Sequence, residues 1–199
     1  MNDDQVFRFI LIAGFLVIIP VGLYHRVKSQ ATGEKLDRRQ EGIFILVSLR
    51  LLGLVGWTGL LIYMVDPAWM AWSCVLLPTW VRWVGVGLMM LAFTLAIWTF
   101  RHLGKNITDT VVTRAEHFLV TTGPYQWVRH PFYVAAGSGF LAVSLMTANW
   151  FVAITGGLAF ALLVVRTRKE EEKLVQRFGD TYREYMQKTG RFLPRIRIP

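Results

Sequence analysis

The sequence predicts an all-α integral membrane protein with about five transmembrane helices, a C-terminal helical hairpin and a cytosolic amphipathic helix. Hydrophobic residues make up 54% of the 199 residues, and a soluble domain this apolar would expose large apolar patches. These residues gather into runs close to the roughly 20 residues that a helix needs to cross a bilayer. The basic residues, which give a formal net charge of +9, lie almost entirely between or after the runs, as is typical of membrane proteins.

The composition also excludes several classes of site. A single cysteine, Cys74, permits no disulfide framework and no cysteine-rich metal site within one chain. The four histidines show no metal-binding spacing, so no metal is expected. The sequence has no glycine-rich phosphate loop and no serine in a nucleophile elbow. The placement of the positive charge favours a lipid-facing surface, and no nucleic-acid partner is expected.

The first half of the chain, residues 1–100, is predicted to be a three-helix transmembrane region. Its apolar runs cover residues 6–23, 43–65 and 80–100. An acidic pair, and no basic leader, precedes the first run, so we expect a retained helix and not a signal peptide.

The second half, residues 101–199, is predicted to be the catalytic region. Its apolar stretch of 132–166 is too long for one span, and Thr147-Ala148-Asn149 stands at its middle. This break predicts a tight hairpin of two helices over residues 131–146 and 150–165, the first of them short for a bilayer.

The distribution of the cations predicts the orientation. Nearly all of the 22 Lys and Arg residues fall within residues 26–41, 101–131 and 166–199. Five alternating spans would place these segments on one side, which the positive-inside rule makes cytoplasmic. We therefore expect the N-terminus outside and the C-terminus in the cytoplasm, as in a prokaryotic plasma membrane.

Other features of the first half are interpreted as architecture. Gly53, Gly56 and Gly59 are predicted to permit close approach of a neighbouring helix. Arg82 is predicted to snorkel to lipid headgroups among a belt of tryptophans at one membrane face. Arg50 falls about two turns inside the second span, where either a functional role or snorkelling is compatible with the sequence. The tryptophans of the belt are Trp69, Trp72, Trp80 and Trp83.

A polar, turn-rich segment over residues 117–133 enters the helix that begins at Pro131. Gly123-Pro124 interrupts regular structure, and the residue before each proline favours extended geometry. The chain is thus predicted to form an elbow at the membrane surface, whose freed backbone groups need protein, water or a ligand. The spacing alone supports equally a ligand site and an interfacial loop with arginine anchors.

A second polar cluster begins at Arg166, after the last apolar run. Helical spacing places Arg166 and Glu170 on one face, where they form either part of a site or a solvated ion pair, and the spacing alone favours the pair. Apolar residues then recur at helical spacing, which predicts an amphipathic helix that lies along the membrane or packs on the elbow. Gly179 is expected to kink this helix.

Two ordered blocks resemble a known family. Residues 117–133 read His-x-Leu-Val-Thr-Thr-Gly-Pro-Tyr-x-x-x-Arg-His-Pro-x-Tyr, and residues 166–185 read Arg-x3-Glu-Glu-x2-Leu-x3-Phe-Gly-x2-Tyr-x2-Tyr. Both blocks, with a hairpin between them, resemble the isoprenylcysteine carboxyl methyltransferase family and its phospholipid-methyltransferase relatives. The resemblance covers residues 103–194.

The resemblance implies that S-adenosylmethionine binds at the cytosolic face and that a lipophilic acceptor enters from the bilayer. It assigns Arg166 to the acceptor's carboxylate. Two residues depart from the family pattern: Ala135 replaces a frequent glycine, and Thr110 stands where a glutamine can contact the cofactor. The cofactor-binding residues that the resemblance implies are His117, Phe118, Leu119, Val120, Tyr125, His130, Pro131, Phe132, Tyr133 and Glu170.

The implied function is S-adenosylmethionine-dependent methyl transfer, with the carboxylate of an isoprenylcysteine-like substrate as the expected acceptor. A carboxylate is already ionised at neutral pH and needs no general base. An amine, phenol or thiol would need Glu170, Glu171 or His130 to accept its proton.

Two alternatives remain. An NADPH-dependent membrane sterol or steroid reductase would need cations for the extra phosphate, which Lys105, Arg114 or Lys173 could supply, although the glutamate cluster suits a cationic cofactor better. A non-enzymatic scaffold would leave the polar elbow unexplained. The sequence does not indicate the oligomeric state.

Overall fold

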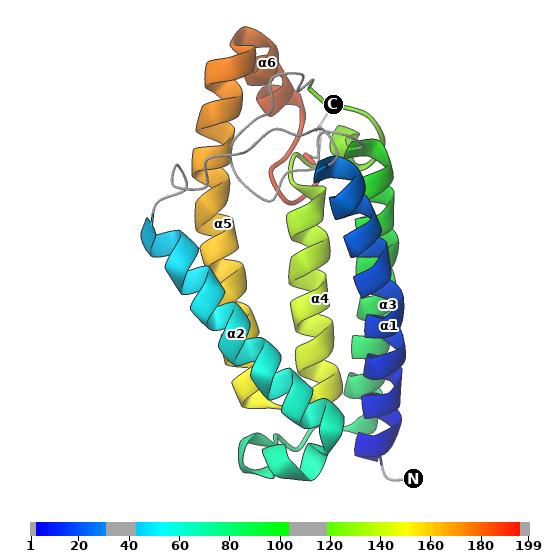
Figure 1. Cartoon of the computed structure of the whole chain (residues 1–199). Coiled ribbons are helices and arrows are strands. Elements are labelled where there is room, and N and C mark those ends of the chain that lie inside the picture. Colours follow the sequence, from blue (N-terminus) through cyan, green and yellow to red (C-terminus); the bar gives the residue numbers. More distant parts are fainter. Residues whose placement is uncertain (1–2, 31–42, 104–118, 196–199) are drawn as a thin grey trace.

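The computed structural model describes residues 3–30, 43–103 and 119–195, and most of these residues are helical. The described residues contain two isolated β-bridges and no strand, which confirms the all-α prediction. In Figure 1 the first five helices run along one another, α2 is inclined to the rest, and α6 lies at the end of the bundle where α4 begins. The α-helices are α1 (Asp3–Gln30), α2 (Ile43–Val65), α3 (Thr79–Leu103), α4 (Pro131–Thr147), α5 (Trp150–Phe178) and α6 (Asp180–Lys188), with 3₁₀ helices η2 (Pro67–Ser73) and η4 (Gly123–Gln126).

Four of the described helices, α1, α2, α3 and α5, are long and apolar enough to cross a membrane. The fourth predicted span, α4, is apolar but has only 17 residues. At 1.5 Å per residue it is about 25 Å long, which is less than the roughly 30 Å of a bilayer's hydrocarbon core. The prediction that the first arm of the hairpin is short is therefore confirmed.

The α5 helix continues without a break past the apolar run that ends at Val165. It has 29 residues, so its charged C-terminal part extends beyond the predicted span of 150–165. Gly179, with φ of 56°, ends this helix and precedes α6. The glycine expected to kink an amphipathic helix thus separates two helices, and one continuous helix, α5, runs from the hairpin turn to the charged end.

The hairpin turn forms where the sequence predicts it. Ala148 ends α4 in the left-handed region, with φ of 47°, and Asn149 caps α5 by accepting a hydrogen bond from the Val152 amide at 3.1 Å. Asn149 also donates to Ser73 Oγ at 2.7 Å, which joins the turn to the end of η2. An asparagine is favoured here because its side chain satisfies one of the amides left free at a helix start.

The glycines of α2 mark its contact with α5. A Cβ at Gly59 would lie 2.6 Å from the Phe151 ring, and one at Gly56 would lie 3.5 Å from Thr155 Oγ1. The predicted close approach is confirmed at these two positions but is wrong for Gly53, which has nothing within 4 Å of such a Cβ. The helices therefore cross near the hairpin turn.

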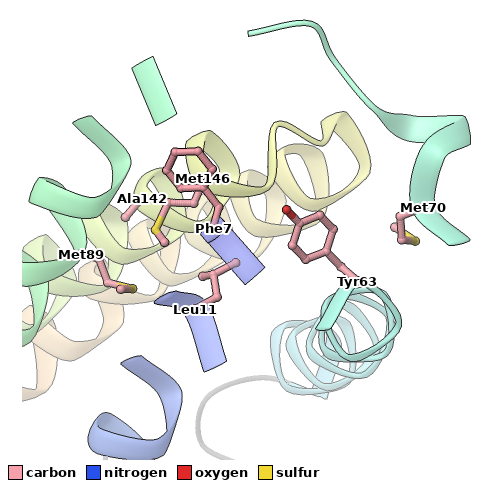
Figure 2. Close-up of a cluster of buried hydrophobic side chains, with 7 residues drawn as sticks. All are labelled: Phe7, Leu11, Tyr63, Met70, Met89, Ala142 and Met146. Atoms are coloured by element: carbon pink, nitrogen blue, oxygen red, sulfur yellow. The ribbon is translucent and has the colours of Figure 1, made fainter. Parts of the chain in front are cut away.

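The hydrophobic core lies toward the end of the bundle where α1 begins. Figure 2 shows side chains of α1, α3 and α4 meeting there, with Tyr63 of α2 and Met70 of η2 beside them. The four tryptophans of the predicted belt are also at this end, on η2 and the start of α3, and all are exposed. The core residues are Phe7, Leu11, Tyr63, Met70, Met89, Ala142 and Met146.

Arg82 does not snorkel, and this prediction is wrong. Its side chain is buried, with 6% of the residue exposed, and its Nε and Nη2 donate to the Met146 carbonyl at 3.0 and 2.8 Å. Nη1 pairs with Asp4 at 2.8 Å, Nη2 donates to the Tyr63 hydroxyl, and the guanidinium lies over the Phe7 ring. A buried cation needs such partners, and Arg82 thereby joins α1, α2, α3 and α4.

Candidate active site

The polar elbow before α4 depends on glycine and proline. Gly123 has φ of 61°, a left-handed conformation that glycine adopts at little cost, and a Cβ there would lie 2.3 Å from the His102 ring. Pro124 is buried as the second residue of η4, while Pro131 occupies the first turn of α4, where its missing amide hydrogen costs nothing. The described part of the elbow, residues 119–130, therefore turns before α4 begins, as predicted.

The backbone of the elbow is satisfied by the segment that follows α6. The Arg129 amide donates to the Gly190 carbonyl at 2.8 Å, and the His130 amide donates to the Arg191 carbonyl at 3.1 Å. Val128 forms an isolated parallel bridge with Gly190. The sequence was compatible with protein, water or a ligand as the hydrogen-bond partner of the elbow's backbone. In the structure, protein carbonyls accept from the Arg129 and His130 amides.

A buried carboxylate, Glu171 on α5, binds the side chains of the elbow. Its Oε1 accepts from Arg129 Nε at 2.9 Å and from His130 Nε2 at 3.1 Å, and its Oε2 accepts from Arg191 Nη2. Because a carboxylate oxygen can only accept, the His130 Nε2 carries a hydrogen in this contact. We call these four residues the Glu171 cluster.

The cluster changes the acidity of Glu171. Burial alone would raise the pKa of its carboxyl group, but the hydrogen bonds from His130, Arg191 and Arg129 outweigh burial and lower the pKa from 4.5 to about 2. Glu171 is therefore ionised at neutral pH, and its charge stabilises the neighbouring guanidinium groups of Arg129 and Arg191. Its buried position and full set of donors make it a poor proton acceptor for a substrate.

The neighbouring carboxylate, Glu170, has a different environment. The Tyr133 hydroxyl donates to Glu170 Oε2 at 2.8 Å, and Glu170 is half-buried. Burial raises the pKa of the Tyr125 phenol and the nearby Glu170 charge raises it further, so this phenol stays protonated at neutral pH. Tyr125, Tyr133 and Glu170 thus bring two aromatic rings and one carboxylate together.

The structure brings most of the other predicted site residues to the same end of the bundle. Arg166 is half-buried one helical turn before Glu170, and Leu119 and Val120 are half-buried at the start of the described elbow. Phe132 is different, because it is exposed and its ring packs on Phe100 of α3, 5.5 Å between centroids. Predicted residues His117 and Phe118, and the departure at Thr110, lie outside the described residues.

Two participants were missed from the sequence: Arg191 as a partner of the site, and Glu171 as the centre of the cluster. A signal existed for the second, since Arg129 at a buried elbow requires a carboxylate and the 170–172 glutamates were the nearest candidates. No local pattern pointed to Arg191, which is 20 residues from Glu171 in sequence.

Two hollows in the structure lie away from Tyr125, Tyr133 and Glu170. One, of about 470 Å³, is an open groove between α5 and α6 beside Arg191, and the other, of about 180 Å³, lies at the opposite end near Asp66 and Cys74. The candidate site is therefore assigned from the arrangement of its side chains and not from either of these hollows. The described residues hold no group of three or more His, Cys, Asp or Glu placed to bind a metal ion.

Fold and site together define a helical integral membrane protein with a buried polar site at one end of its bundle. A family model described as phospholipid methyltransferase matches residues 80–181, about half of the chain. The chain belongs to the phospholipid methyltransferase family.

The chain is similar to a metal-resistance protein and to a methyltransferase. The nickel-cobalt-cadmium resistance protein NccN of Alcaligenes xylosoxydans xylosoxydans is 30% identical over 125 residues, covering 60% of this chain and 54% of that protein. The protein-S-isoprenylcysteine O-methyltransferase of Homo sapiens is 33% identical over 133 residues, covering 59% of this chain and 43% of that enzyme. The chain thus spans about half the length of these relatives.

One solved structure shares the fold. The eukaryotic intramembrane Ras methyltransferase, isoprenylcysteine carboxyl methyltransferase, matches with a TM-score of 0.54 at 20% identity. The match covers 87% of this chain and 63% of that one. The resemblance noted in the sequence, to isoprenylcysteine carboxyl methyltransferases and their phospholipid-methyltransferase relatives, is confirmed.

Proposed function

We propose that this protein transfers a methyl group from S-adenosylmethionine to a lipophilic acceptor, with the carboxylate of an isoprenylcysteine-like molecule as the preferred acceptor. Family membership and the human relative's name support the reaction. The observation that carries the proposal is the hydrogen bond from Tyr133 to Glu170 beside the Glu171 cluster. It places a carboxylate that lies outside the Glu171 cluster next to an aromatic residue at this end of the bundle.

The residues present fit a cationic cofactor. Glu170 could accept from an ammonium or from ribose hydroxyls, and the rings of Tyr125 and Tyr133 present faces that attract a cation. These groups suit a polyphosphate poorly, because a carboxylate repels it, and the reductase alternative gains no support from the relatives described. S-adenosylmethionine, when bound, would supply a methyl group activated by a positive sulfur.

In this proposal Arg166 is the residue that handles the acceptor. It is half-buried and is the first charge after the apolar part of α5, where a guanidinium can hold a carboxylate in a fixed orientation. Catalysis then comes from orientation and from excluding water around the nucleophile. A carboxylate acceptor needs no base, which agrees with Glu171 being fully engaged by Arg129, His130 and Arg191.

We further propose that residues 101–199 form the catalytic region and that the site end of the bundle is cytoplasmic. Leu119, Val120, Tyr125, His130, Pro131, Phe132, Tyr133 and Glu170, together with His117 and Phe118, are the proposed cofactor-binding residues. His130 would act chiefly through the cluster, since its Nε2 faces Glu171.

The test is calorimetric titration of the detergent-purified protein with S-adenosylhomocysteine and, in parallel, NADPH. We expect saturable binding of S-adenosylhomocysteine, weakened about tenfold or more by Glu170→Gln, because charge-assisted hydrogen bonds contribute roughly 1.5–3 kcal/mol. Glu172→Gln, an exposed glutamate two residues away, is the matched control and should bind normally. Binding of NADPH alone would favour the reductase, and binding of neither would favour a scaffold.

A second measurement tests the acceptor. An S-prenylated cysteine with a free carboxylate should accept the methyl group, and Arg166→Lys should raise its KM more than it changes cofactor affinity, because lysine cannot form the bidentate contact. Equal methylation of the corresponding amide would contradict the carboxylate assignment.

A further inference from the structure

The segment that follows α6 lies against the polar elbow at several points. Beside the two backbone hydrogen bonds from Arg129 and His130, the guanidinium of Arg129 donates through Nη1 to the Met186 carbonyl at 3.1 Å and to the Thr189 carbonyl. The Tyr185 hydroxyl donates to the Tyr125 carbonyl at 2.5 Å. Residues 185–191 are therefore part of the frame around the elbow.

Arg191 supplies the side chain that completes this frame. Its Nη2 donates to Glu171 Oε2, whereas Oε1 is shared by Arg129 and His130. The side chain of Glu171 is only 4% exposed, and that of Arg191 is 34% exposed. Removal of Arg191 would leave a buried carboxylate oxygen without this donor, which is costly in a site of low dielectric constant.

The Glu171 cluster is connected directly to the proposed cofactor-binding residues. Glu170 directly precedes Glu171 on α5. Tyr133 lies on α4, three residues after His130. The rings of Tyr133 and His130 contact each other edge-on, with 5.4 Å between their centroids. A shift of the cluster would therefore move Glu170 and Tyr133 relative to each other. Their 2.8 Å hydrogen bond depends on the register between α4 and α5 that the cluster maintains.

We propose that Arg191 is a positioning residue for the cofactor site, acting through Glu171 to hold the elbow and Glu170 in the geometry that binds the cofactor. This inference rests on the proposed function. Arg191 also lies beyond the residues 80–181 that match the family model, so membership in the family does not by itself assign it a role.

The first experiment compares Arg191→Ala and Arg191→Lys with the wild-type protein by calorimetric titration with S-adenosylhomocysteine. Misplacement of binding groups by even 1 Å has large effects, so we expect Arg191→Ala to raise the Kd about tenfold or more and lysine to recover much of the loss. The titrations are made well below the melting temperature of each apo-protein, so that a loss of global stability does not appear as a loss of affinity. Arg183→Ala is the matched control, because Arg183 forms an exposed ion pair with Asp180 at 2.7 Å and should leave the Kd unchanged.

The second experiment tests the route through Glu171. Residues that act as a unit have non-additive effects, so Arg191→Ala should raise the Kd much less in a Glu171→Gln background than in the wild type. If Arg191→Ala does not fold, Arg191→Gln replaces it, and a wild-type Kd for that variant would overturn the proposal.

The outcomes are distinguishable. A variant that melts at a lower temperature but binds S-adenosylhomocysteine with the wild-type Kd would make Arg191 merely structural and overturn the inference alone. Additive effects of the Arg191 and Glu171 substitutions would also overturn it. Failure of the wild-type protein to bind S-adenosylhomocysteine would overturn the proposed function, and the inference would fall with it.

Discussion

Two adjacent glutamates on α5 have opposite surroundings. Glu171 is buried and its two oxygens accept from Arg129, His130 and Arg191. Glu170 is half-buried and accepts from Tyr133. Neighbouring residues on a helix point about 100° apart, so one carboxylate faces the frame of the site while the other faces Tyr125 and Tyr133.

The environment of Glu171 predicts a pH dependence of stability. Its pKa is about 2 in the folded protein and 4.5 ordinarily, so its contribution is fully present above about pH 4.5 and is lost as the pH falls toward 2. The difference in pKa corresponds to about 3 kcal/mol. We expect Glu171→Gln to destabilise the protein at pH 7 and the gap between variant and wild type to narrow as the pH falls from 5 to 3.

Thermal unfolding in detergent across this pH range measures the gap. Glu172→Gln, which is exposed on the same helix, should show no such pH-dependent difference. A constant gap between wild type and Glu171→Gln at every pH would contradict the role assigned to the Glu171 charge.

At the scale of elements, the hydropathy pattern predicted where the helices lie, but it did not predict which side chains of different helices contact each other. The runs at 43–65 and 80–100 correspond to α2 and α3, and the break at Thr147-Ala148-Asn149 is the observed hairpin turn. These features follow from local composition, since span length and helix caps are set by neighbouring residues. The helix boundaries differ because α1 and α5 continue beyond their apolar runs.

The missed features depend on contacts between residues distant in sequence. Arg82 bonds to the Met146 carbonyl 64 residues away, and Arg129 bonds to Glu171 42 residues away. A local sequence pattern shows that a cation is present, but it does not show whether a carbonyl at a helix end or a carboxylate will accept its hydrogen bonds. The elbow itself could be predicted because local residues determine it: Gly123 permits a left-handed conformation, and each proline fixes its own φ.

The hairpin turn provides a prediction at this scale. Asn149→Ala removes the cap on the Val152 amide and the bond to Ser73 Oγ, and we expect a loss of about 1–3 kcal/mol. Asn149→Ser keeps a neutral cap acceptor and loses the amide donor to Ser73, so it should destabilise less. The midpoint of unfolding in detergent measures both, and equal stability of Asn149→Ala and wild type would contradict the importance of this turn.

At the scale of the whole molecule, the two ends of the bundle differ in character. One end carries the Asp4–Arg82 pair, the tryptophans and the hairpin turn, and the other carries the elbow, α6 and the Glu171 cluster. The helix order places the start of α1 and the start of α6 at opposite ends (Figure 1). The excess of cations at the site end is the basis for proposing that it faces the cytoplasm.

The chain's single cysteine allows this orientation to be tested. Cys74 is exposed at the end of η2, away from the site. In intact cells or right-side-out vesicles, a membrane-impermeant maleimide should therefore label the wild-type protein without permeabilisation. A Cys74→Ser, Lys188→Cys variant, with its cysteine on the exposed end of α6, should be labelled only after permeabilisation, and the reverse pattern would contradict the proposed orientation.

The shortness of α4 has a consequence for how a lipid-borne substrate reaches the site. In the proposed orientation, with the hairpin turn at one face of the bilayer, the roughly 25 Å of α4 would place Pro131 and the elbow closer to the bilayer midplane than the end of a full-length span. A long-chain molecule whose polar head rests at the interface could then react without being lifted from the leaflet. Withdrawal of an acyl or prenyl chain from the bilayer costs roughly 0.8 kcal/mol for every methylene exposed to water. An elbow at this depth would let the proposed acceptor react without that cost.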